Sequence, residues 1–200
     1  AVDAALAAAE AAFGPIDVLV SGAAGNFPAS ALSMSANAFK TVVDIDLMGT
    51  FHVLKLAFPR LRKPGACIIN VSAPQAAIPM PLQMHVCAAK SGVDMITRVS
   101  ALEWASAGVR VNSIVPGPIA DTEGMARLAP TPDAARQVAQ SIPLGRYGRK
   151  QEIADACLWL ASPMASYVTG VVLPIDGGWS LGGASLSMTG LMQYSSNPAT

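Results

Sequence analysis

The sequence has little charge and no block of like charge. Only 13% of its 200 residues are charged, and 13 basic side chains balance 13 acidic ones. Such a balance gives no electrostatic footprint for nucleic acid or for an anionic membrane, so neither is expected as a partner. Hydrophobic residues make up 52% of the chain. This is enough for one sizeable core and too apolar for disorder, so we expect a single globular domain over residues 1–200.

Cysteine is scarce. Cys67, Cys87 and Cys157 are odd in number, widely spaced and set in apolar sequence. The pattern argues against a disulfide framework and against a metal site, and it favours reduced, buried thiols. We therefore expect no metal and a reducing compartment.

Targeting signals are missing too. Residues 1–12 are rich in alanine, but Asp3 and Glu10 interrupt them and no basic segment precedes them. This stretch therefore predicts neither a signal peptide nor a membrane span. Residues 197–200 carry no peroxisomal tripeptide, and the expected location is the cytoplasm.

The glycines lack the spacing of a dinucleotide-binding turn. A Rossmann unit begins with a strand and a G-x-G turn, whose amides hold the pyrophosphate at a helix N-terminus. Here no two glycines are separated by a single residue. We expect the chain to be a fragment; the alternatives are that the missing strands are supplied elsewhere or that the fold has been cut down.

Short β-branched runs alternate with long alanine-rich stretches. This alternation is typical of parallel strands joined by crossover helices, and it predicts an α/β, Rossmann-like, three-layer, doubly wound sheet without its first strands. Strands are predicted at 16–21, 67–72, 109–115 and 171–175, and helices at 2–13, 36–61, 83–107 and 151–161. Residues 120–149 fit no strand and are expected to form a lid over a substrate, and residues 180–200 to form a C-terminal arm.

Five stretches of the sequence have a recognisable pattern: Asp17–Phe27 (DVLVSGAAGNF), Asp44–Phe51 (DIDLMGTF), Met84–Lys90 (MHVCAAK), Arg110–Pro118 (RVNSIVPGP) and Thr122–Gly124 (TEG). Together they resemble one protein family, the short-chain dehydrogenases/reductases, and most closely its 2,4-dienoyl-CoA reductases of the peroxisomal type. In that alignment Ala1 falls inside the helix that precedes the family's fourth strand.

The family's catalytic tyrosine is missing. It normally lies four residues before the lysine, one helical turn away on the same face, where the lysine acidifies the phenol. Val86 occupies that position before Lys90, and Ala73 occupies the position of the usual serine. Ser72 is adjacent, but strand alternation points it to the other side, so we interpret it as structural. A tyrosine-dependent carbonyl reductase is disfavoured.

Asp46 and Lys90 are the candidate catalytic residues. Most family members have Asn at the position of Asp46. A carboxylate within an apolar helix must be hydrogen-bonded or functional, because burying it alone is costly. We favour a role in proton delivery over a structural hydrogen bond to backbone. Asp44 lies on a different helical face and is interpreted as a solvated charge.

The resemblance also implies a cofactor, NADPH, and binding residues for it and for a fatty acyl-CoA substrate. For the cofactor these are Ser21, Gly22, Ala23, Ala24, Lys90, Pro116, Gly117, Ile119 and Thr122. For the substrate they are Asn26, Phe27, His85, Gly124 and Arg127. For His85 an equal alternative is a purely structural role, as a packed histidine whose ring nitrogens are hydrogen-bonded.

The function that the resemblance implies is NADPH-dependent reduction of 2,4-dienoyl-CoA in the β-oxidation of unsaturated fatty acids. Another short-chain oxidoreductase acting on an acyl thioester and a non-catalytic scaffold remain as alternatives. The helices after Ala36 and Gln83 are apolar on more than one face, and family members pair them between subunits. A homodimer or homotetramer is therefore expected. Acyl chain length, the product's double-bond position and the choice of NADPH over NADH are left open.

Overall fold

The computed structural model describes residues 1–182, in which four strands form one sheet. They are β1 (Val18–Ser21), β2 (Cys67–Val71), β3 (Arg110–Pro116) and β4 (Val172–Ile175), in the order β1-β2-β3-β4. β2 pairs in parallel with both β1 and β3. The parallel α/β, Rossmann-like prediction is confirmed. Because parallel strands end at the same edge of a sheet, the carboxyl ends of β1 and β2 lie side by side.

The chain divides into two compact units, which we describe separately. The first unit comprises Ala1–Val115 and Ala154–Leu173, and the second comprises Pro116–Ile153 and the described part of Pro174–Thr200. A single domain stays a prediction. Most of the C-terminal arm expected at 180–200 lies outside the described residues.

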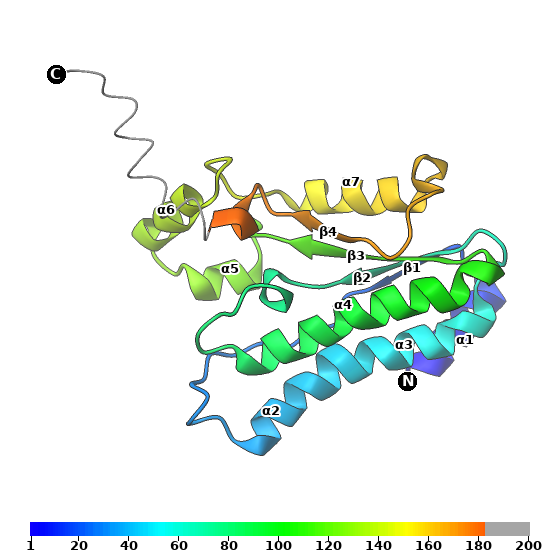
Figure 1. Cartoon of the computed structure of the whole chain (residues 1–200), viewed down its shortest axis with the longest axis horizontal. Coiled ribbons are helices and arrows are strands. Elements are labelled where there is room, and N and C mark those ends of the chain that lie inside the picture. Colours follow the sequence, from blue (N-terminus) through cyan, green and yellow to red (C-terminus); the bar gives the residue numbers. More distant parts are fainter. Residues whose placement is uncertain (183–200) are drawn as a thin grey trace. The chain divides into compact units, whose positions relative to one another are not determined.

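Helices cover both faces of the sheet in the first unit. α1 (Val2–Phe13), α3 (Gly49–Ala57) and α4 (Met84–Trp104) lie on one face (Figure 1). The part of α7 (Lys150–Ala161) that belongs to this unit lies on the other, where the Leu160 carbonyl is 3.4 Å from the Cys67 thiol. Two helical layers therefore enclose the sheet, as the three-layer expectation requires.

The helix expected at 36–61 is interrupted. It consists of α2 (Ala36–Val42), a π-helical segment η1 (Val43–Met48), α3, and a 3-10 turn at Phe58–Arg60. The Ser35 hydroxyl accepts a hydrogen bond from the Ala38 N–H and caps α2. Within η1 the Gly49 N–H bonds to the Asp44 carbonyl, five residues back. Such π segments are rare and frequently occur at functional sites.

The second unit contains two helices that the sequence pattern did not predict. α5 (Glu123–Leu128) and α6 (Pro132–Ser141) lie within the expected lid at 120–149. Threonine hydroxyls cap both, because Thr122 accepts from the Met125 N–H and Thr131 from the Ala134 N–H. Both helices are too short for their apolar periodicity to be distinguished from a loop.

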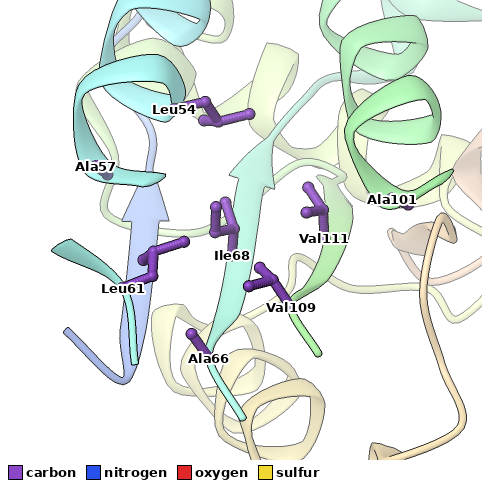
Figure 2. Packing of buried hydrophobic residues seen from close by; sticks show 8 residues of the cluster. All are labelled: Leu54, Ala57, Leu61, Ala66, Ile68, Ala101, Val109 and Val111. Atoms are coloured by element: carbon purple, nitrogen blue, oxygen red, sulfur yellow. The ribbon is translucent and has the colours of Figure 1, made fainter. Parts of the chain in front are cut away.

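The main apolar core joins the sheet to α3 and α4. Leu54 and Ala57 of α3, Ile68 of β2, Val111 of β3 and Ala101 of α4 are all buried in one cluster (Figure 2). Ile68 is paired in register with Val111, so their side chains lie on the same face of the sheet.

We expect Ile68→Ala to destabilise the protein by roughly 2–5 kcal/mol, because it leaves a cavity at a site with no solvent exposure. Urea unfolding measures the change. Leu32→Ala is the control, since Leu32 is 98% exposed and an exposed site changes stability by about 0.5 kcal/mol or less. Equal effects of the two changes would contradict the assigned core.

Among the described residues, every helix is too short or too polar to cross a membrane. The same residues contain no group of three or more His, Cys, Asp or Glu side chains arranged to hold a metal ion. The three cysteines are free thiols. Burial raises the pKa of Cys67 and of Cys157, so these thiols stay protonated.

Candidate active site

Asp46 and Lys90 form a buried ion pair in the first unit. The Asp46 side chain is 1% exposed and the Lys90 side chain 6%. Lys90 Nζ lies 3.3 Å from Asp46 Oδ2. The structure thus brings together the two residues predicted to be catalytic, which are 44 positions apart in the sequence.

Backbone groups hold both side chains in place. The Gly25 N–H donates to Asp46 Oδ1 over 2.7 Å, and Lys90 Nζ donates to the Val71 carbonyl over 3.1 Å. Gly25 lies in the loop after β1, and Val71 is the last residue of β2. The pair therefore lies at the carboxyl edge of the sheet, where open α/β sheets bind ligands.

Local geometry explains why Asp46, and not Asp44, faces Lys90. Asp46 lies in η1 and is fully buried, whereas Asp44 is exposed and pairs with Lys40 one turn earlier. The interpretation of Asp44 as a solvated charge is confirmed. Helix α4 comes close to η1 at Gly92, where a Cβ atom would lie 2.7 Å from a methyl group of Leu47. A glycine at that position lets the lysine helix approach the aspartate segment closely.

The position of the missing tyrosine is filled by apolar packing. Val86 is 3% exposed and belongs to a buried cluster with Val42 and Ala89, against which Phe27 and Leu47 pack.

Ser72 lies near a different partner, Asp94 of α4. Burial raises the pKa of Asp94, and the Ser72 hydroxyl and Arg98 oppose that effect. The Ser72 Oγ atom is buried without a hydrogen bond of good geometry. A structural role for Ser72 stays the prediction. The sequence analysis did not single out Asp94. Its position four residues after Lys90, on the same helical face, could have indicated that it lies near the lysine.

The predicted substrate residues of the first unit lie together. The Phe27 ring lies 4.5 Å from the His85 ring, measured between centroids. Asn26 is exposed, and its side-chain amide lies 3.4 Å from Gln83 Oε1, which also accepts from Gln75 over 2.8 Å. The loop after β1 thus lies against the start of α4.

The predicted cofactor residues of the first unit follow β1. Ser21 is its last residue and is buried, whereas Gly22, Ala23 and Ala24 are exposed. A Cβ atom on Gly22 would lie 3.1 Å from the Val71 side chain, the residue whose carbonyl holds Lys90. This loop and the lysine therefore share one neighbour at the sheet edge.

The remaining predicted residues belong to the second unit. Pro116 ends β3, and a Cβ atom on Gly117 would lie 2.6 Å from the Asp176 backbone. Only glycine fits there without displacement of the chain. Ile119 is buried, and its carbonyl accepts a hydrogen bond from the Thr122 hydroxyl over 2.9 Å.

Gly124 and Arg127 lie on α5 and are exposed, and Arg127 pairs with Glu123. The second unit also has a cleft of about 500 Å³ lined by Ile119, Gly148 and Asp176 among others. The Arg146 guanidinium, hydrogen-bonded to Glu152 at its rim, lowers the pKa of that carboxyl to about 2. The pair therefore stays charged at neutral pH.

Comparison with known proteins decides the family. The family model described as enoyl-(acyl carrier protein) reductase matches residues 1–180. The chain belongs to the short-chain dehydrogenases/reductases. Peroxisomal 2,4-dienoyl-CoA reductase [(3E)-enoyl-CoA-producing] of Rattus norvegicus is 47% identical over 167 residues, which cover 83% of this chain and 57% of that protein. A probable 2,4-dienoyl-CoA reductase [(2E)-enoyl-CoA-producing] of Bacillus subtilis is 39% identical over 170 residues, covering 84% and 67%.

A solved gluconate dehydrogenase has the same fold. The gluconate 5-dehydrogenase of Burkholderia cenocepacia J2315, in complex with NADP and tartrate, superposes with a TM-score of 0.83 at 28% identity. The match covers 90% of this chain and 71% of that one. The chain therefore spans a little more than half the length of the rat relative and about 70% of this structure.

Proposed function

We propose that the protein containing this chain reduces 2,4-dienoyl-CoA thioesters with NADPH. The observation that carries the proposal is the buried Asp46–Lys90 pair beside an apolar residue, Val86, where the family's tyrosine would lie. The names of the rat and B. subtilis relatives support this substrate class.

Reduction of a dienoyl thioester requires fewer catalytic groups than reduction of a ketone does. When bound, NADPH supplies the hydride. With hydride added at C5, the diene electrons shift toward the thioester, C3 and C4 become doubly bonded, and negative charge collects on the thioester oxygen. Protonation at C2 then gives a 3-enoyl-CoA, so one hydride and one proton are consumed. No alkoxide forms, and a phenol is not required as its proton donor.

The proton would come from Asp46 or from a water that Asp46 orders. Its Oδ1 is held by the Gly25 N–H and its Oδ2 by Lys90, so the carboxylate has a fixed orientation. Fixed orientation is what makes general acid–base catalysis effective, which contributes typically 10²–10⁴-fold.

The described residues fit the nicotinamide side of a dinucleotide. Lys90 Nζ donates to the Val71 carbonyl, whereas its 3.3 Å contact with Asp46 Oδ2 is an ion pair without hydrogen-bond geometry, so the ammonium keeps N–H groups that could donate to a ribose hydroxyl. In the first unit Ser21, Gly22, Ala23 and Ala24 would form one wall. The NADP complex of the Burkholderia relative supports a nicotinamide cofactor, and NADPH in preference to NADH is our proposal.

Product analysis tests the proposal. The whole protein is incubated with NADPH and 2,4-hexadienoyl-CoA in deuterated water, and the product is examined by NMR. We expect a 3-enoyl-CoA with solvent deuterium at C2. A 2-enoyl product, as in the name of the B. subtilis relative, would retain the substrate class but contradict protonation at C2. Absence of any reduced product would contradict the function and favour a scaffold.

An apolar groove between α3 and α4 supports assembly with a second copy. Its volume is about 840 Å³, and Phe51, Met95 and Trp104 are among its lining residues. Beside it, Leu102 of α4 is 81% exposed. We propose that these helices pair between subunits in a homodimer or homotetramer, because exposed apolar surface of this kind marks an interface.

Met95→Arg is expected to convert the oligomer to monomer, since Met95 is 56% exposed in the groove and a charge there would be desolvated in the interface. Sedimentation equilibrium measures the mass. Leu144→Arg is the control, because Leu144 is 67% exposed but lies in the second unit. An unchanged mass for Met95→Arg would rule out this interface.

A further inference from the structure

His85 is a buried polar side chain without a hydrogen-bond partner. It has no exposed surface, and neither Nδ1 nor Nε2 has a partner within the part of the chain that the structure describes. A neutral imidazole carries one donor and one acceptor. Each buried polar group left unpaired costs about 1–3 kcal/mol. The sequence allowed a satisfied packing histidine; the geometry here lacks the hydrogen bonds that such a role requires.

The ring of Phe27 packs against the imidazole. Phe27 is only partly buried and lies over His85 with the planes tilted by 58°. Phe27 belongs to the irregular segment between β1 and α2. The contacts that hold this segment include the Gly25 N–H on Asp46 and the Ala29 N–H on the Leu82 carbonyl. Phe27 itself belongs neither to a strand nor to a helix.

His85 lies next to the proposed reaction centre. It directly precedes Val86, the residue at the position of the missing tyrosine. Phe27, which contacts His85, also packs against the Val86 cluster together with Leu47, the neighbour of Asp46. Phe27 thus contacts both the imidazole and the apolar cluster that fills the position of the missing tyrosine.

We propose that His85 is a substrate-binding residue that donates a hydrogen bond to the thioester oxygen of a bound acyl-CoA. The inference rests on the proposed function and names a partner for the oxygen that becomes negatively charged. The acyl chain displaces the Phe27 ring, and the imidazole N–H takes the oxygen as its acceptor. No proton leaves the histidine. The N–H stabilises the enolate oxygen, while C2 receives its proton from Asp46 or its water.

This role explains why an unpaired polar group is retained in a core. An apolar side chain of similar size would suit the ligand-free protein better, because it removes an unsatisfied donor and acceptor. Departures from a well-paired core are expected chiefly at functional sites. The inference therefore predicts opposite effects of one substitution on stability and on binding.

His85→Leu in the whole protein separates the possibilities. We expect its urea midpoint to equal or exceed that of the wild type. We also expect binding of hexanoyl-CoA, a saturated analogue that cannot be reduced, to weaken by about tenfold or more in calorimetry, which corresponds to about 1.4 kcal/mol. NADPH affinity should not change. His85→Gln, which keeps an N–H donor, should recover part of the hexanoyl-CoA affinity.

His52→Leu is the matched control, because the only other histidine of the chain is exposed on α3. It should change neither the urea midpoint nor the affinity for hexanoyl-CoA.

A lower midpoint for His85→Leu with unchanged hexanoyl-CoA binding would overturn the inference and make His85 structural. If the wild type reduces dienoyl-CoA and His85→Leu binds hexanoyl-CoA normally, the role of His85 is wrong but the reductase proposal stands. If the wild type binds hexanoyl-CoA through His85 yet reduces no dienoyl-CoA, the reductase proposal fails and the binding site stands. If the wild type binds no acyl-CoA, both fail.

Discussion

Asp46→Asn lowers kcat for 2,4-hexadienoyl-CoA by about 10²–10⁴-fold, the range of a general acid–base group. The substitution keeps the size of the side chain and an oxygen that can accept from the Gly25 N–H, so the loop after β1 retains its anchor. What is lost is the carboxylate that orders the water. Asn is also the residue that most family members have here, but in those members a tyrosine accompanies it.

The control for this prediction is Asp44→Asn. Asp44 lies two residues away, is exposed and pairs with Lys40 on the outside of the helix. Steady-state rates of NADPH oxidation, together with the Kd for NADPH, separate chemistry from cofactor binding. We expect kcat to fall only for the Asp46 variant, with the Kd for NADPH within a few-fold of the wild type. A kcat equal to that of the Asp44 variant would remove Asp46 from the mechanism.

Lys90→Met destabilises the fold by roughly 3–5 kcal/mol, because it leaves the Asp46 carboxylate buried without its ion-pair partner. Methionine retains most of the length of the aliphatic stem, so the loss comes from the charge and not from packing. The double variant Asp46→Asn, Lys90→Met should regain most of this stability, since neither charge is then present. It should still be inactive, because both functional groups are gone.

The exposed pair Lys40–Asp44 provides a matched comparison. It has the same chemistry on a solvated helical face, where such a pair contributes about 0.3–0.5 kcal/mol. Urea unfolding of Lys40→Met, Lys90→Met and the double variant measures the difference. Equal losses for the two lysines, or no recovery in the double variant, would show that the Lys90–Asp46 pair is not buried as described.

The parallel α/β arrangement could be predicted from the sequence because strands and helices differ in their apolar period. Ile68 lies in a continuous apolar run, residues 66–69, which is typical of a strand buried on both faces. The Asp46–Lys90 pair could also be anticipated. A carboxylate and an ammonium in apolar helices each need a partner, and the different helical face of Asp44 excluded it as the buried acid.

Other features depend on tertiary contacts that the pattern does not contain. The π segment at Val43–Met48 rests on a backbone bond from Gly49 to Asp44 that replaces the usual spacing of four residues. The hydrogen bond from the Gly25 N–H to the Asp46 carboxylate also joins residues 21 positions apart, and no local pattern indicates it. The state of His85 depends on which groups surround its two nitrogens. Sequence could not decide between a packed and a ligand-binding histidine.

The most direct test is NADPH oxidation by the whole wild-type protein with 2,4-hexadienoyl-CoA, measured beside a plain ketone at the same concentration. A site with Asp46 and Lys90 but with Val86 in place of tyrosine predicts turnover of the dienoyl thioester and none of the ketone. Reduction of the ketone at a comparable kcat/KM, or no oxidation with either substrate, would contradict a tyrosine-free dienoyl-CoA reductase.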